Sequence, residues 1–170
     1  LEEILARNCR ISDTARAARF CRQAEQARYF CKDIHYPDVP LHTPTFDTTL
    51  LSAHIRPGHV MLIDCWASWC GPCRAAIPAV KALYDKYDRD RFDVISISLD
   101  SKKEDWQKAL EEEKMPWPQF IAGNRGYEQL TLRYNINSIP NLILIDDKGQ
   151  VVCNTFSPEE ISIELEEILR

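Results

Sequence analysis

Two periods of apolar residues divide most of the chain into strands and helices. Apolar runs rich in β-branched residues predict strands over residues 46–51, 60–65, 92–99, 139–145 and 151–155. Apolar residues three and four positions apart predict helices over residues 75–84, from Ser101 to a stop at Pro116, and over 127–134 and 158–169. Helices separate the early strands, which favours parallel pairing, while the last two strands form an antiparallel hairpin. We therefore predict an α/β fold, a mixed central sheet with helices on both faces.

Polar residues at the ends of these elements support the prediction. Ser101 followed by Glu104 is typical of a capping box, and Ser157 followed by Glu160 repeats that spacing at the start of the last helix. Asp146-Asp147-Lys148-Gly149 favours a hairpin turn before the last strand.

The first part of the chain has a different pattern. Residues 1–34 contain neither Pro nor Gly and predict two helices broken near residues 11–13, whereas residues 35–45 contain three prolines and predict an extended linker. We divide the chain into a helical extension with a Pro-rich linker, residues 1–43, and a compact domain, residues 44–170. The extension either packs on the domain or is the remnant of a larger region. The chain begins Leu-Glu-Glu, without Met or a signal peptide, so we expect a processed or excised fragment.

Composition and charge exclude several classes of function. The 170 residues are 45% hydrophobic, enough for one substantial core, and carry a net charge of −5 without a basic patch for nucleic acid. No apolar run approaches the roughly 20 residues of a membrane span, and membrane anchoring by a segment outside the sequence stays open. The four histidines have irregular spacing, so we predict neither a metal site nor a cofactor.

The seven cysteines are the strongest chemical signal. They are Cys9, Cys21, Cys31, Cys65, Cys70, Cys73 and Cys153. The odd number excludes complete pairing within the chain, and an oxidising compartment would allow one structural pair among the first three, whose connectivity stays open. Cys65 and Cys153 fit small buried apolar positions.

Cys70 and Cys73 lie where a predicted strand gives way to a predicted helix. The free N–H groups and partial positive charge of a helix N-terminus favour a thiolate over a thiol. Thiol pKa values in Cys-x-x-Cys motifs fall to roughly 3.5–7.5, which makes the first cysteine nucleophilic at neutral pH. Two thiols at this spacing can form and open a disulfide.

These residues resemble the thioredoxin superfamily. The resemblance rests on Trp69-Cys70-Gly71-Pro72-Cys73, on Pro78, on the Ile139-Pro140 step and on the Asp-Lys-Gly hairpin, and it covers about residues 44–170. The 67 positions between Cys73 and Pro140, with an insertion over residues 102–125, are more similar to the TlpA/ResA-like thiol-disulfide oxidoreductases than to plain thioredoxin.

The resemblance implies a thioredoxin-like fold and a role for each residue of the motif. Cys70 would attack a substrate disulfide, Cys73 would resolve the mixed disulfide, and Asp64 would be the buried base for Cys73. Pro140 would be cis, which would present the backbone of Ile139 to an extended substrate. Trp69, Gly71 and Pro72 would complete the substrate-binding surface.

Two residues depart from the pattern of the resemblance. ResA-like proteins often have a glutamate three residues beyond the second cysteine, where this chain has Ala76. Asn141 follows Pro140 where threonine is commoner. With Asp64 six residues before the first cysteine, the chain instead has the carboxylate of thioredoxin.

The resulting prediction is a protein thiol-disulfide oxidoreductase, a reductase in direction. Its partners would be protein disulfide substrates and an upstream electron-donor protein. The resemblance implies the bacterial cell envelope, the periplasm, although composition alone also permits the cytoplasm. One alternative is a thioredoxin-like binding module in which the thiols are incidental. A thiol peroxidase is the weaker alternative, because Ala67 stands where a peroxidase would have threonine.

Overall fold

The computed structural model describes residues 38–170. The helices predicted within residues 1–34 lie outside the described residues, as do Cys9, Cys21 and Cys31. The described strands are β1 (Pro40–His42), β2 (Thr48–Leu50), β3 (Val60–Trp66), β4 (Phe92–Ser98), β5 (Gln119–Ile121), β6 (Asn141–Ile145) and β7 (Val151–Thr155). The helices are the 3-10 helix η1 (Leu51–His54) and the α-helices α3 (Gly71–Lys86), α4 (Lys103–Glu113), α5 (Gly123–Tyr134) and α6 (Pro158–Ile168).

All the described strands join one mixed sheet in the order β2-β1-β5-β4-β3-β6-β7. The pairs β3/β4 and β4/β5 are parallel, and the pairs made by β6 with β3 and with β7 are antiparallel. This confirms the predicted change from parallel to antiparallel pairing. The Asp146–Gly149 turn between β6 and β7 also forms, since the Gly149 N–H donates to the Asp146 carbonyl at 3.0 Å.

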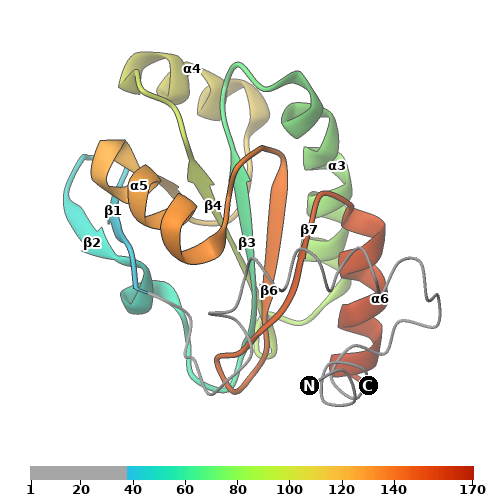
Figure 1. Ribbon diagram of the computed structural model, residues 1–170. Coiled ribbons are helices and arrows are strands. Elements are labelled where there is room, and N and C mark those ends of the chain that lie inside the picture. Colours follow the sequence, from blue (N-terminus) through green and yellow to red (C-terminus); the bar gives the residue numbers. More distant parts are fainter. Residues whose placement is uncertain (1–37) are drawn as a thin grey trace. The chain divides into compact units, whose positions relative to one another are not determined.

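Helices cover both faces of the sheet, as predicted. Figure 1 shows α3 and α6 on one side of the strands and α5 on the other. Alternate residues of β3 face α3: Leu62 packs in a cluster with Val80 and Leu83 of α3 and with α6, while Trp66 packs in a second cluster. The second cluster lies at the N-terminal end of α3 and includes residues of α4.

Two short strands were not predicted. β5 is only three residues long, and its alternation is hidden by the prolines that precede it. β1, residues 40–42, pairs with β2 and with Ile121 of β5, so the sheet begins before residue 44 and includes part of the segment expected to be a linker. Helix α5 passes close to β1 at Gly126, where a Cβ atom would lie 2.6 Å from the Pro40 carbonyl oxygen. Only glycine therefore fits at this crossing.

The two predicted capping boxes had different outcomes. At α6 the Ser157 hydroxyl accepts a hydrogen bond from the backbone N–H of Glu160, as predicted. At α4 the prediction was wrong: the helix begins at Lys103, after Lys102 as N-cap, and no side chain caps it. Burial of Trp106 and of Ala109 against the core fixes which residues are helical, since packing outweighs local capping in short helices.

Candidate active site

Cys70 and Cys73 form a disulfide at the N-terminus of α3. Their Cα atoms are 5.2 Å apart, and Cys70 is the N-cap residue, whose Sγ accepts a hydrogen bond from the Cys73 N–H at 3.2 Å. Pro72 lies in the first turn, where a missing N–H costs the helix nothing. The Cys70 sulfur therefore meets the free N–H groups and the positive end of the helix dipole, which favour its thiolate after reduction.

Both sulfur-bearing residues are buried in the oxidised protein. Cys70 is 5% exposed and Cys73 is 2% exposed, because the disulfide packs in one cluster with Trp66, Ile77 and Trp106. Cys70 is thus the more accessible of the two, but only narrowly.

A buried carboxylate holds the loop that leads into the disulfide. Asp100 accepts hydrogen bonds from the N–H and the hydroxyl of Ser68, at 2.8 and 2.7 Å, and from the hydroxyl of Ser98 at 2.7 Å. The end of β4 is also tied to the end of β3, since the Leu99 N–H donates to the Trp66 carbonyl at 2.8 Å. These bonds fix residues 67–70 against the sheet. Asp100 was not predicted; its signal is a charged residue that closes a buried strand.

Asp64 lies on the face of β3 that α3 covers. Asp64 is two residues from Leu62 and two from Trp66, so the three side chains point to the same face of the strand. Leu62 packs in the cluster that contains the middle of α3, and Trp66 packs in the cluster that contains its N-terminal end. The side chain is 5% exposed. Burial raises the pKa of Asp64 to about 6, and a hydrogen bond from the Ser96 hydroxyl opposes that rise. A carboxylate with such a pKa is divided between its two protonation states close to neutral pH.

Ser96 and Trp117 complete the surroundings of Asp64. The Ser96 Oγ donates to the Asp64 Oδ2 at 2.8 Å, and the Trp117 indole N–H donates to the Ser96 Oγ at 2.8 Å. Neither residue was predicted for the site. The only signal in the sequence is a serine within an apolar strand.

The remaining predicted site residues lie around the disulfide. The Ile139–Pro140 peptide bond is cis, as predicted, and the partly buried Ile139 packs against the cluster that contains the disulfide. Trp69 is 70% exposed, and the neighbouring Gly71 and Pro72 are exposed as well. The structure thus places an exposed aromatic side chain directly beside a buried disulfide.

The other described cysteines lie away from this chemistry. Cys65 and Cys153 are buried, as predicted. Burial, with a smaller contribution from Asp64, raises the pKa of the Cys65 thiol, which keeps that thiol protonated.

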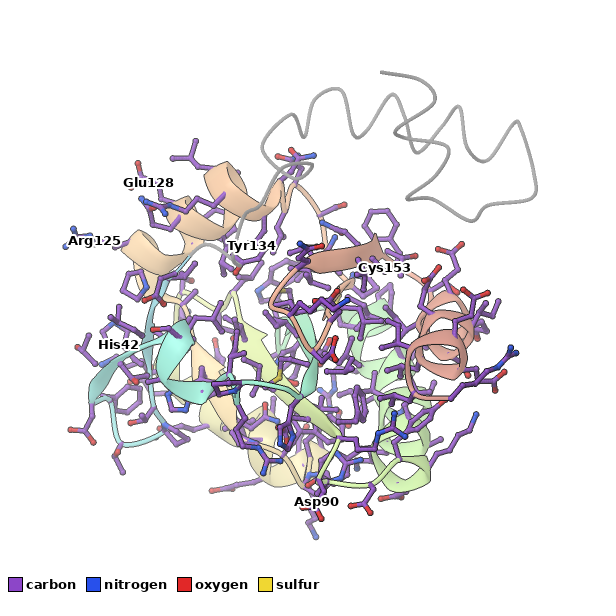
Figure 2. The ribbon with its side chains drawn as sticks, turned by 90° about the horizontal axis from the view of Figure 1, so that it is seen from below. His42, Asp90, Arg125, Glu128, Tyr134 and Cys153 are labelled. Carbon is purple, nitrogen blue, oxygen red and sulfur yellow. A yellow bond between two sulfur atoms is a disulfide. The ribbon has the colours of Figure 1, made fainter. Side chains whose placement is uncertain are left out.

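Cys153 lies on β7, and Tyr134 lies at the end of α5, whose Arg125 and Glu128 point outward (Figure 2). Within residues 38–170, no group of three or more His, Cys, Asp and Glu side chains could hold a metal ion.

The fold and the site together define a class of protein. The site combines three features: a disulfide at a helix N-terminus, a loop with a cis-proline beside it, and a buried aspartate on the adjoining strand. This combination is typical of thiol-disulfide oxidoreductases.

Comparison with known proteins places the chain more closely. A family model described as thioredoxin-like matches residues 58–151, and the chain belongs to that family. The chain is 26% identical to the thiol-disulfide oxidoreductase ResA of Geobacillus kaustophilus over 133 residues, which are 74% of this chain and 75% of that protein. It is 33% identical to the nucleoredoxin of Xenopus laevis over 128 residues, 72% of this chain and 29% of that protein.

A solved structure agrees with these relatives. A thiol-disulfide oxidoreductase from Bacteroides fragilis superimposes with a TM-score of 0.70 at 25% identity, covering 79% of this chain and 98% of that one. The chain is therefore a thiol-disulfide oxidoreductase, with Cys70 and Cys73 as its dithiol pair.

Proposed function

We propose that the protein is a reductase of protein disulfides that transfers two electrons from the Cys70/Cys73 dithiol to its substrate. The observation that supports this most strongly is the disulfide at the N-terminus of α3 above a face of β3 that contains Asp64, a buried carboxyl group with a raised pKa. Thiol-disulfide exchange needs an attacking thiolate, a resolving thiol and a base, and the chain has a candidate for each.

The first step is attack by the Cys70 thiolate on one sulfur of the substrate disulfide. A bond forms between the Cys70 Sγ and that sulfur, the substrate S–S bond breaks, and the other substrate sulfur leaves as a thiolate. Cys70 is the attacking residue because its Sγ occupies the N-cap position, where the helix stabilises negative charge.

The second step is resolution by Cys73. The buried Cys73 thiol gives its proton to Asp64 and attacks the Cys70 sulfur, which releases the second substrate thiol and closes the Cys70–Cys73 disulfide. The dithiol is oxidised and the substrate disulfide is reduced to two thiols. A base with a pKa of about 6 accepts a proton efficiently near neutral pH.

The substrate would bind across the exposed residues beside the disulfide. Trp69 offers a large apolar surface, Gly71 and Pro72 leave the approach to Cys70 free of long side chains, and the backbone at Ile139 would pair with an extended substrate chain. The cis-Pro140 loop would then align the scissile disulfide with Cys70.

The turn between the cysteines supports reduction of the substrate as the direction of electron flow. Potentials of related dithiols run from roughly −270 to −120 mV, and the Gly71-Pro72 dipeptide resembles the reducing end. An upstream donor protein with its own dithiol would return the electrons. The resemblance to ResA-like proteins supports a place in the bacterial cell envelope. No helix within residues 38–170 is both long and apolar enough to cross a bilayer.

Reduction of insulin by the purified protein, with dithiothreitol as electron source, tests the proposal. We expect Cys70→Ser and Cys73→Ser each to lose catalysed turnover, while Cys65→Ala, which removes a buried thiol outside the site, keeps it. Unchanged turnover in both active-site variants would contradict the proposal and leave the thioredoxin-like binding module as the alternative.

A further inference from the structure

The sheet register places a hydroxyl directly beside Asp64. Asp64 of β3 pairs with Ser96 of β4 in parallel register, so both side chains lie on the face covered by α3. The Ser96 hydroxyl uses this position to donate to the Asp64 Oδ2 at 2.8 Å. Ser96 itself is fully buried.

Strand β5 brings a second donor to the same hydroxyl. Gln119 of β5 is the register partner of Ser96, and the Ser96 N–H donates to the Pro118 carbonyl at 3.1 Å, which fixes the segment just before β5. Trp117 therefore lies over Ser96, and its indole N–H donates to the Ser96 Oγ at 2.8 Å. Trp117 is 3% exposed, so this bond is shielded from water.

The direction of these two bonds is determined by chemistry. An indole N–H can only donate, and an ionised carboxylate can only accept, whereas a hydroxyl donates one hydrogen and accepts at its oxygen. With Trp117 bound to its oxygen, the single hydrogen of Ser96 can go to Asp64 Oδ2 at 2.8 Å or to the Met115 sulfur at 4.0 Å. A carboxylate is the far stronger acceptor, so the hydrogen is directed at Asp64. Bonds in such a chain strengthen one another.

We propose that Trp117 and Ser96 are positioning residues that set the proton affinity of Asp64, and thereby the pH at which Cys73 resolves the mixed disulfide. The catalytic meaning of this inference depends on the proposed function, in which Asp64 is the base. The hydrogen bond from Ser96 stabilises the carboxylate and partly offsets the effect of burial, so that Asp64 can both accept and release a proton near neutral pH.

The other groups near Asp64 do not explain this affinity. On α3, Cys70 and Cys73 are disulfide-bonded and do not titrate in the oxidised protein. The charged side chains of Arg74 and Lys81 on that helix contact the end of α4 instead: Arg74 pairs with Glu112 and Glu113, and Lys81 donates to the Glu113 carbonyl. On β3 the adjacent Cys65 points to the opposite face. The register partner on β6 is the apolar Leu142, and the residues of α6 in the neighbouring cluster are apolar as well. The Ser96 hydroxyl is thus the polar contact that acts on Asp64 within the described residues.

The test is a titration of the Asp64 carboxyl carbon by NMR in the oxidised protein, with the signal assigned by its loss in Asp64→Asn. We expect a midpoint about one pH unit higher in Ser96→Ala, because the carboxylate loses a charge-assisted hydrogen bond. Trp117→Phe should raise it by less, since the Ser96 hydroxyl remains but is no longer oriented. Ser96→Thr keeps a hydroxyl and should preserve the wild-type midpoint.

Trp106→Phe is the matched control. Trp106 is as deeply buried as Trp117, but its indole nitrogen has no hydrogen-bond partner among residues 38–170. The variant therefore changes a buried ring of the same kind without removing a hydrogen bond to Ser96 or Asp64. Its Asp64 midpoint should equal that of the wild type. An unchanged midpoint in Ser96→Ala would overturn the inference, and an unchanged midpoint in Trp117→Phe alone would remove Trp117 from it.

A kinetic readout connects the titration to the reaction. The pH profile of Cys73-dependent release of a thiol from Cys70 should move upward by the same interval as the Asp64 midpoint in each variant, and a profile that stays in place would contradict the positioning role. The titration uses no substrate. If the midpoints move as expected but the wild type reduces no insulin, the proposed function fails while the effect of Ser96 and Trp117 on Asp64 stands.

Discussion

The carboxylate of Asp100 accepts hydrogen bonds from both the backbone N–H and the hydroxyl of Ser68, two residues before Cys70. Asp100 lies two residues after the end of β4, and Ser68 lies two residues after the end of β3. One side chain therefore connects the ends of two neighbouring parallel strands. The position of the disulfide therefore depends on a buried polar contact as well as on the start of α3.

Removal of this contact should destabilise the fold. Asp100→Ala leaves the Ser68 N–H, the partly buried Ser68 hydroxyl and the buried Ser98 hydroxyl without their acceptor. We expect a loss of about 2–4 kcal/mol in the free energy of unfolding, measured by urea titration. Asp147→Ala, at an exposed position of the β6–β7 turn, is the control and should change stability by less than about 0.5 kcal/mol. Equal stabilities for the two variants would show that the Asp100 contacts contribute nothing.

Asp64 should make stability depend on pH with a distinctive sign. Its pKa is raised from 3.8 to about 6 in the folded protein, so the native state binds the proton more tightly than the unfolded state does. The stability from this group is fully present below pH 4 and is lost as the pH rises through 6. Asp64→Asn should therefore stabilise the protein by about 2–3 kcal/mol at pH 7.5 relative to its effect at pH 4.

Unfolding curves of wild type and Asp64→Asn at both pH values measure this difference. Asp147→Asn, which removes an exposed carboxylate, should show no such change between the two pH values. A stabilisation by Asp64→Asn that is equal at pH 4 and pH 7.5 would mean that the pKa of Asp64 is not raised by folding.

The same substitution should separate the two chemical steps. Asp64→Asn should slow resolution by roughly a hundredfold at pH 7, because the Cys73 thiol loses its base, and leave the attack by Cys70 nearly unchanged. The first step is measured as reaction of reduced Cys73→Ser protein with a chromogenic disulfide. The second is measured as release of the chromophore from Cys70 in protein that retains Cys73. Equal slowing of both steps would count against Asp64 as the base for Cys73.

Trp69 should affect substrate binding without affecting the fold. The side chain is 70% exposed, so Trp69→Ala should leave the free energy of unfolding within about 0.5 kcal/mol of wild type. Loss of its apolar contact should lower kcat/KM for insulin by about tenfold, while reaction with a small aromatic disulfide changes little. Leu132→Ala, at a 68% exposed position on α5, is the control. A drop of the same size with that variant would remove the argument for Trp69.

The sequence predicted the parts of the fold that rest on local pattern. The strands β3 and β6 are almost wholly apolar, and β4 has apolar residues at nearly every second position. The hairpin and the Ser157 cap depend on residues three positions apart. β1 and β5 were not predicted, because a strand of three residues is too short to show a clear alternation of apolar and polar positions. The start of α4 escaped it because burial of Trp106, rather than Ser101, decides where that helix begins.

The site divides in the same way. Cys70, Cys73 and Pro140 could be located because their signals are short motifs, and Asp64 because it interrupts a buried strand at a fixed distance from Cys70. Ser96 and Trp117 could not be located in this way. They are 32 and 53 positions from Asp64 in the sequence, and the register of the sheet brings Ser96 to Asp64 and Trp117 to Ser96. The burial of Cys70 also depends on residues from several elements, which no local pattern encodes.

The reduction potential of the Cys70/Cys73 couple, measured by equilibration with glutathione or dithiothreitol buffers, tests the reductase assignment most directly. Since about 30 mV corresponds to a tenfold change in a two-electron equilibrium, the two ends of the superfamily's range are easily distinguished. We predict a value near −270 mV, at which the dithiol reduces exposed or strained protein disulfides, whose own potentials are less negative. A value near −120 mV would contradict the assignment, because the disulfide form would then oxidise substrate thiols instead.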